Sequence, residues 1–129
     1  MIIIKDWPPN IEEIRKRFDL TGRKPVFTYG NKLYNPYGFQ IPKDLMVHEE
    51  THEKQQTNVK DWWSKYLTDN EFRLSQELEA YRNQYKYACD NYPRQVRRQL
   101  LNHIISSLSS KMYGSMVTKK QAEGLLKYE

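Results

Sequence analysis

The chain contains a single cysteine and no long apolar run, and each scarcity excludes a class of protein. Because Cys89 has no second cysteine to pair with, a disulfide within the chain and a cysteine-rich zinc site are both excluded, and a reducing compartment is favoured. No stretch of 18 apolar residues is present, and the apolar residues 1–4 are too few for a signal sequence. We therefore expect a cytoplasmic protein with no membrane partner.

Histidine is also scarce, and two of the three histidines lie four residues apart. Residues 48–52, His-Glu-Glu-Thr-His, form an HExxH pentad. In a helix, positions i and i+4 lie on one face, about 6 Å apart along the axis, so both imidazoles can bind one metal ion. Glu49 falls on the same side, where it can accept a proton from a zinc-activated water. The pentad predicts zinc bound by His48 and His52, with Glu49 as the general base.

The residues around the pentad are typical of a helix. No glycine or proline occurs in residues 45–56, Pro42 suits the first helical position, and Asp44 favours the positive end of the helix dipole. The alternative is a chance match in an exposed charged helix. In the motif's usual form the two x positions and their neighbours are mostly uncharged, and Glu50 and Glu53 depart from that form. In the predicted helix, one side carries Leu45, His48, Glu49, His52 and Gln56, and the other carries Glu50, Glu53 and Lys54.

A second helix is predicted over residues 70–88 and supplies the third ligand. Thr68 and Asp69 before it are candidate caps. Glu77 lies within the apolar stripe of this helix, where a carboxylate must be paired or bound to a metal, whereas Glu79 projects to the opposite, solvated face. Glu77 is therefore the predicted ligand, and an ion pair with Arg73 or Arg82 is the alternative. The stripe consists of Leu74, Leu78, Tyr81, Tyr85 and Ala88.

These two motifs, His48-Glu49-x-x-His52 followed by Glu77-x-x-Ala80, resemble those of the gluzincin metallopeptidases. The resemblance covers roughly residues 26–88 and extends to small uncharacterised metallopeptidase-like proteins encoded by bacteriophages, which would place the chain in the host cytoplasm. It implies a zinc peptidase in which His48, His52 and Glu77 bind Zn²⁺. Tyr81 stands where several gluzincins have Asp or Asn, so the role of that position is in doubt.

The remaining segments suggest the surroundings of this site. A first helix is predicted from Pro8 to Leu20 with Asn10 as its cap, and two short strands flank Gly30-Asn31, a turn signal. By resemblance, this hairpin is the candidate edge that holds the substrate backbone. The paired tryptophans at 62–63 are either core residues or a wall of the substrate cleft.

The C-terminal part reads as a core-facing helix from Arg94, followed by a break at Gly114 and a last short helix capped by Thr118. By resemblance, a His or Tyr from this part stabilises the transition state, so His103 and Tyr113 are candidates; an ordinary core or boundary position is the alternative for each. The apolar stripe of the longer helix comprises Val96, Leu100, Leu101, Ile104, Ile105, Leu108 and Met112.

Charge supports a rival hypothesis. The net charge is +5, and residues 93–129 contain seven Lys or Arg against two Asp or Glu. Arg94, Arg97 and Arg98 could bind nucleic acid or an acidic partner, although no nucleic-acid-binding motif accompanies them. The alternative to an enzyme is thus a non-enzymatic phage protein with this basic face and a structural zinc site closed by His103.

Taken together, the sequence predicts one α+β domain over residues 1–129. We expect it to be mostly helical and zincin-like, with a short antiparallel sheet beside the HExxH helix. The expected activity is hydrolysis of peptide bonds in a peptide or protein substrate, with Zn²⁺ as cofactor. Nucleic acid is the less favoured partner.

Overall fold

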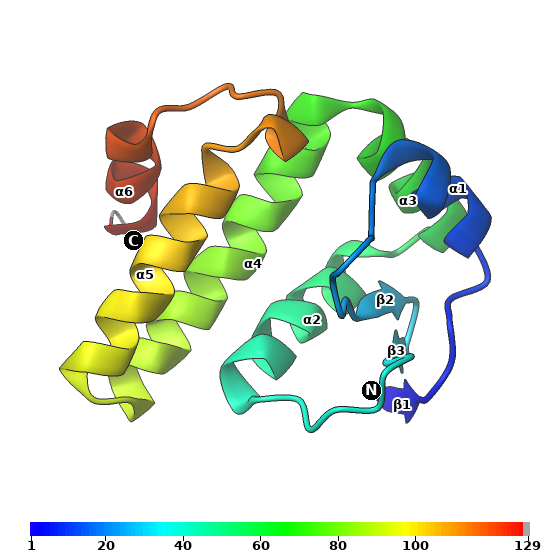
Figure 1. Cartoon of the computed structure of the whole chain (residues 1–129), viewed down its shortest axis with the longest axis horizontal. Coiled ribbons are helices and arrows are strands. Elements are labelled where there is room, and N and C mark those ends of the chain that lie inside the picture. The colour runs from blue at the N-terminus through cyan, green and yellow to red at the C-terminus, as the bar shows by residue number, and fades with distance from the viewer. Residues whose placement is uncertain (128–129) are drawn as a thin grey trace.

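The structure is a computed structural model that describes residues 1–127. Helices dominate it, with a small sheet near the N-terminus, so the predicted mostly helical α+β class is confirmed (Figure 1). The described elements, in chain order, are β1 (Ile2–Ile4), α1 (Ile11–Arg17), β2 (Phe27–Tyr29), β3 (Lys32–Tyr34), α2 (Lys43–Gln55), α3 (Val59–Thr68), α4 (Asn70–Asn91), α5 (Arg94–Leu108), the 3₁₀ helix η1 (Lys111–Tyr113) and α6 (Lys119–Lys127).

The sheet has the order β1-β3-β2 and is mixed, whereas the sequence predicted a short antiparallel sheet or hairpin. The predicted hairpin is present: β2 and β3 are antiparallel, with Thr28 opposite Leu33, and Gly30 takes a φ of +63° in the turn. The unpredicted strand is β1, which pairs in parallel with β3 and places Ile3 opposite Leu33. Three isoleucines favour a strand, but a run of three residues is too short to indicate which distant strand it joins.

Side-chain caps mark the starts of α3, α4 and α6. Asp69 accepts a hydrogen bond from the backbone N–H of Phe72, which confirms it as the cap of α4, and Thr118 caps the helix that follows it in the same way. The first helix is shorter than the predicted Pro8–Leu20: α1 spans Ile11–Arg17, and Asn10 precedes it without making a side-chain capping hydrogen bond. Helix α3, which carries the tryptophans, was not predicted.

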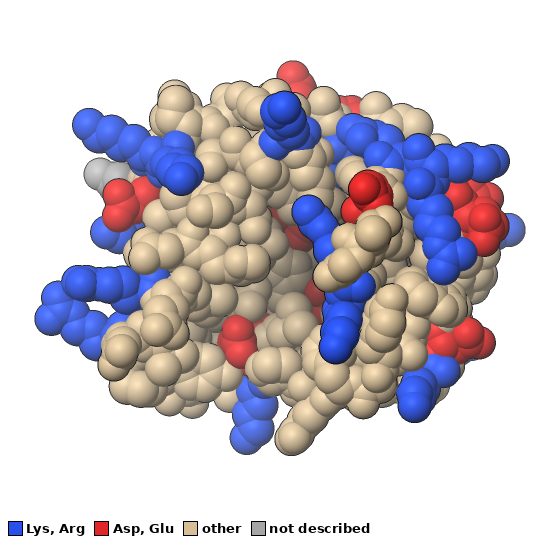
Figure 2. Space-filling model, in the orientation of Figure 1, with Lys and Arg blue, Asp and Glu red and all other residues tan. Residues whose placement is uncertain are grey.

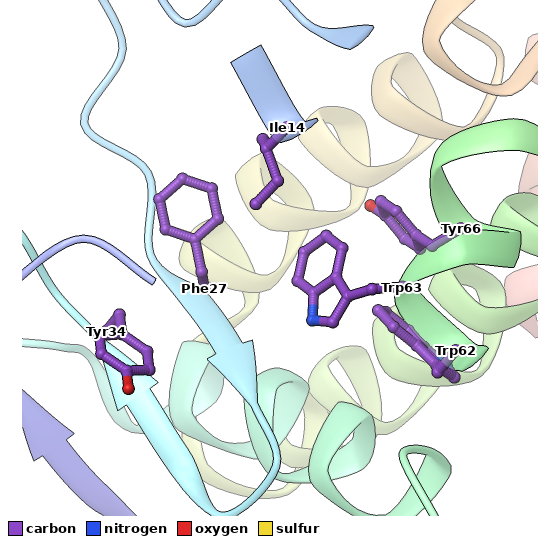
Figure 3. Packing of buried hydrophobic residues seen from close by; sticks show 6 residues of the cluster. All are labelled: Ile14, Phe27, Tyr34, Trp62, Trp63 and Tyr66. Carbon is purple, nitrogen blue, oxygen red and sulfur yellow. The ribbon is translucent and has the colours of Figure 1, made fainter. Parts of the chain in front are cut away.

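Helix α4 is the central element. It contacts α2 and α3 on one side and α5, η1 and α6 on the other, so the two sides of the molecule meet along it (Figure 1). Around the sheet, α1 and α3, an aromatic cluster forms the first core, which consists of Ile14, Phe27, Tyr34, Trp62, Trp63 and Tyr66 (Figure 3). A second, largely aliphatic core joins α5, η1 and α6 and consists of Leu101, Ile104, Leu108, Tyr113, Ala122 and Leu126.

The apolar stripe predicted for α5 is buried over its C-terminal turns, whereas Val96 in the first turn is 42 % exposed.

Within residues 1–127, none of the helices combines the length and the apolar character needed to cross a membrane.

Candidate metal centre

The HExxH pentad lies on α2, with its functional face turned into the protein. His48, Glu49 and His52 are each 5–6 % exposed, whereas Glu50 and Lys54 on the opposite side are exposed to solvent. The predicted division of the helix into a buried polar face and a solvated charged face is therefore correct.

Glu77 comes from α4 and meets both histidines through one oxygen. Its Oε1 lies 2.9 Å from Nε2 of His48 and 3.0 Å from Nε2 of His52. Glu77 is 7 % exposed and Glu79 is exposed, as the facing argument requires. Two imidazole nitrogens and one carboxylate oxygen thus converge on a single point between α2 and α4.

Arg73 does not pair with Glu77. Its Nε donates to the carbonyl oxygen of Tyr66 at 2.7 Å, and its Nη1 donates to the side chain of Asn70 and to the carbonyl oxygen of Met112. The arginine instead ties the end of α3 to η1 across the start of α4. The partners of Glu77 at the centre are the two histidines and the hydroxyl of Tyr66.

The outer nitrogens of the two imidazoles face side-chain amides. Nδ1 of His48 lies 2.9 Å from Oε1 of Gln84, and Nδ1 of His52 lies 2.8 Å from Oε1 of Gln55. The amide orientations are fixed, because the Gln84 nitrogen donates to Asp44 and the Gln55 nitrogen donates to the carbonyl oxygen of Gln76. An amide oxygen only accepts, so both Nδ1 atoms carry their protons.

This tautomer leaves the lone pair of each Nε2 directed at the Glu77 oxygen. A nitrogen lone pair that faces a carboxylate oxygen at hydrogen-bond distance is repelled by that oxygen, unless a proton or a cation lies between the two atoms. A donor set of two Nε2 atoms and one carboxylate oxygen is also the set that catalytic zinc takes from proteins. The residues at this point therefore fit a zinc ion.

The electrostatics favour positive charge at the same point. Burial alone lowers the pKa of His52, but the charge of Glu77 and its hydrogen bond outweigh burial and raise that pKa to about 9. Burial alone raises the pKa of Glu77, but the two histidines outweigh it and hold that pKa well below its ordinary value. The carboxylate at the centre is therefore ionised and stabilises any cation between the imidazoles.

Glu49 lies beside the place where the histidine nitrogens and the Glu77 oxygen converge. Its Oε1 accepts a hydrogen bond of 2.9 Å from the hydroxyl of Thr28 on β2, and its Oε2 lies 3.8 Å from Nε2 of His48. Ligand atoms of His48, Glu49 and His52 all lie within 4.8 Å of one another, so Glu49 is also close enough to bind a metal. Two carboxylates, from α2 and from α4, are thus available as the third ligand.

A cleft of about 810 Å³ opens onto this centre, and Glu49, His52 and Glu77 line it. The hollow is visible near the middle of the face in Figure 2, with acidic side chains inside it. The aromatic core forms part of the lining, so Trp62 and Trp63 are both core residues and walls of the cleft.

Both candidate transition-state stabilisers line the same cleft, on the wall built by α5 and η1. Tyr113 is 2 % exposed and lies near Tyr81, whose ring packs against His48 at 4.5 Å between centroids. His103 is exposed on the cleft wall, and among residues 1–127 no ion pair or hydrogen bond joins it to His48, His52 or Glu77. The group of ligand atoms formed by His48, Glu49 and His52 includes neither His103 nor Glu77, but Glu77 contacts both histidines directly. The geometry therefore brings both residues to the cleft but does not bring His103 into the ligand set.

The hairpin edge is partly occupied by side chains. β2 is an edge strand, but the carbonyl oxygen of Thr28 accepts hydrogen bonds from Gln56 at 2.9 Å and from Trp63 at 3.1 Å, and the N–H of Gly30 donates to Gln56. This stretch is closed to a substrate strand unless Gln56 moves. The residue before the strand, Val26, does line the cleft.

Some basic residues of the C-terminal part are exposed, whereas one of them bonds the backbone of a neighbouring helix. Arg97 donates to the carbonyl oxygens of Cys89 and Tyr92 at 3.4 and 3.3 Å and so helps to close the end of α4. Arg94 and Arg98 are exposed. On the face in Figure 2, several lysines and arginines gather at the upper right, and others lie beside the central hollow and at the left and lower margins.

The supporting partners of the centre were not predicted from the sequence. They are Thr28, Asp44, Gln55, Tyr66 and Gln84, and they lie on β2, α2, α3 and α4. The nearest signal is the placement of Gln84 seven residues after Glu77, two helical turns along the same face.

Comparisons with known proteins do not identify a family for this chain. No protein-family model matches it, and no match is found among curated proteins or solved structures. The resemblance to gluzincins therefore rests on the two motifs and stays a prediction.

Proposed function

We propose that the chain is a zinc-dependent peptide hydrolase with a gluzincin-like, and so zincin-like, centre. The proposal rests on one observation: the Nε2 atoms of His48 and His52 converge on one oxygen of Glu77. Hydrogen bonds from their Nδ1 atoms to Gln84 and Gln55 fix the tautomers of both imidazoles. A buried HExxH face, a second helix that supplies a carboxylate and an adjoining cleft support it further.

In this proposal, His48, His52 and Glu77 hold the metal and Glu49 is the base. Zinc, when bound, supplies a Lewis acid that lowers the pKa of a water and polarises a substrate carbonyl. Glu49 accepts the proton of the attacking water through Oε2, the oxygen that does not bond Thr28, and passes it to the leaving amine. Tyr113 lies on the opposite wall, where it is the candidate to face the developing oxyanion.

A structural zinc site is the weaker alternative. It requires a fourth protein ligand. His103 is exposed on the cleft wall, and Glu49, which is close enough to coordinate, is held by the hydrogen bond that its Oε1 accepts from Thr28. The cleft also gives solvent and a substrate access to the centre, which a closed structural site does not need.

The experiment is a comparison of the wild type with Glu49→Gln. Both should contain one zinc per chain and melt at similar temperatures, because the substitution leaves His48, His52 and Glu77 in place. A peptide library digested by the wild type and analysed by mass spectrometry should show cleavage that falls at least about 100-fold in Glu49→Gln. Equal cleavage by both proteins, or none by the wild type, would contradict the proposal.

A further inference from the structure

The centre contains two buried carboxylates, Glu77 and Glu49. In each, one carboxylate oxygen accepts a hydrogen bond from a hydroxyl, and the other carboxylate oxygen faces the histidines. Glu77 accepts from the hydroxyl of Tyr66 at Oε2, and its Oε1 faces both Nε2 atoms. Glu49 accepts from the hydroxyl of Thr28 at Oε1, and its Oε2 lies 3.8 Å from Nε2 of His48. The two oxygens of each carboxylate are therefore distinguished by a single hydrogen bond.

The two hydroxyls come from elements that the metal-binding motifs do not include. Thr28 on β2 is 2 % exposed, and its backbone carbonyl is fixed by Gln56 and Trp63. Tyr66 on α3 stacks on Trp62 at 4.8 Å with an angle of 20° between the rings. Because packing already locks both residues, little conformational entropy is lost when their hydroxyls orient the carboxylates.

The two carboxylates compete for one role. Ligand atoms of His48, Glu49 and His52 lie within 4.8 Å of one another, so a small rotation would let Glu49 bind the metal beside Glu77 or in its place. A carboxylate that coordinates the metal is a poor proton acceptor, because its lone pair is taken and its charge is neutralised. Hydrolysis therefore requires that one carboxylate binds and the other is held back.

We propose that Tyr66 and Thr28 are positioning residues that assign these roles: Tyr66 holds Glu77 as the metal ligand, and Thr28 holds Glu49 away from the metal as the proton acceptor. The assignment rests on the proposed zinc-dependent hydrolysis. It predicts that removal of the two hydroxyls has opposite consequences for metal binding, which a merely structural role of either residue would not produce.

The experiment measures metal affinity in the full-length chain by titration of the metal-free protein with Zn²⁺ and Co²⁺. Tyr66→Phe should weaken the affinity about 10- to 100-fold, the usual cost of losing a hydrogen bond to a metal ligand. Thr28→Val should bind both metals more tightly than the wild type, because Glu49 is free to join the ligands. Its hydrolysis rate should nevertheless fall about 10- to 100-fold, and Thr28→Ser should restore the rate.

Matched controls separate these effects from loss of packing. Thr51→Val makes the same isosteric change at a buried threonine whose hydroxyl donates to the backbone of its own helix and accepts from Asn83 on α4, and it should leave affinity and rate unchanged. Tyr113→Phe removes a buried hydroxyl from the same cleft and should leave metal affinity unchanged. Thermal melts of the metal-free proteins check that each variant folds.

The outcomes distinguish the assignment from the proposed function. An unchanged affinity in Tyr66→Phe, or an equal loss of affinity in Thr28→Val and Tyr66→Phe, would overturn the assignment. A wild type that binds zinc and cleaves nothing would contradict hydrolysis, while the opposite shifts in affinity would still support separate roles for the two hydroxyls. A wild type that binds neither metal would overturn both.

Discussion

Gln84 and His48 are joined side chain to side chain, with Oε1 of the amide 2.9 Å from Nδ1 of the imidazole. The amide nitrogen of Gln84 donates to Asp44 at 2.8 Å, and Asp44 also accepts from the hydroxyl of Tyr92. A chain of hydrogen bonds thus runs from the candidate metal centre to the start of α2. It holds the His48 ring in the orientation and tautomer that direct its Nε2 at Glu77.

Replacing Gln84 with methionine should weaken zinc binding about 10- to 100-fold without unfolding the protein. Methionine has a similar shape but cannot accept the Nδ1–H of His48, so the ring loses its fixed tautomer. The measurement is a competitive zinc titration of the purified variant. Asn83→Ala, one residue earlier on α4 and bonded to Thr51 rather than to the centre, is the control and should bind zinc like the wild type.

The two glutamates of α4 should differ sharply in their effect on metal content. His48→Ala, His52→Ala and Glu77→Ala should each lose the zinc that the wild type retains, whereas Glu79→Ala should keep it. Glu79 is exposed and reaches the centre only through its hydrogen bond with Gln55. Elemental analysis of protein purified without chelator measures this directly. Zinc lost from Glu79→Ala and kept by Glu77→Ala would refute the ligand assignment.

The sequence could predict those features of the centre that depend on the residues of one helix alone. The positions of His48, Glu49 and His52 on one face follow from helical periodicity, and the burial of Glu77 follows from the apolar stripe around it. Both arguments need only residues within about two turns of each other. The fold class and the starts of α4 and α6 follow from equally local signals, such as the caps at Asp69 and Thr118.

What could not be predicted depends on packing between distant segments. The hydroxyl of Thr28 meets Glu49 only because β2 lies beside α2, and Tyr66 meets Glu77 only because α3 folds back onto α4. Threonine and tyrosine are ordinary residues in a strand and an aromatic helix, so neither gives a signal of its role. The parallel pairing of β1, residues 2–4, with β3 is unpredictable for the same reason.

Arg73 should be the most sensitive basic residue of the chain. It is 0 % exposed and bonds the carbonyl oxygens of Tyr66 and Met112, with its guanidinium 5.0 Å from the Phe18 ring. Arg73→Leu should lower the free energy of unfolding by about 3 kcal/mol, because two buried carbonyl oxygens lose their donor. Urea denaturation followed by circular dichroism measures the change.

The exposed Arg98 provides the comparison for that experiment. Arg98→Leu removes the same charge from the surface of α5 and should change the free energy of unfolding by no more than about 0.5 kcal/mol. Similar losses in both variants would show that net charge, and not the buried hydrogen bonds of Arg73, determines the stability.

The basic surface of α5 should not be required for the metal centre. Arg94 and Arg98 are exposed and belong to none of the hydrogen bonds described around the centre, so reversing both to glutamate should leave zinc content unchanged. Arg97 is kept in this variant, because it bonds the carbonyl oxygens at the end of α4 and its loss would disturb the fold.

The same double variant tests the rival nucleic-acid function. We expect the wild type to bind DNA or RNA weakly and without sequence preference, because two exposed arginines supply few phosphate contacts and each contact is lost steeply as salt rises. Fluorescence anisotropy with labelled single- and double-stranded probes at 50 and at about 150 mM salt measures this. Tight, sequence-selective binding that survives the higher salt and disappears in Arg94→Glu/Arg98→Glu would reverse the ranking of the two functions.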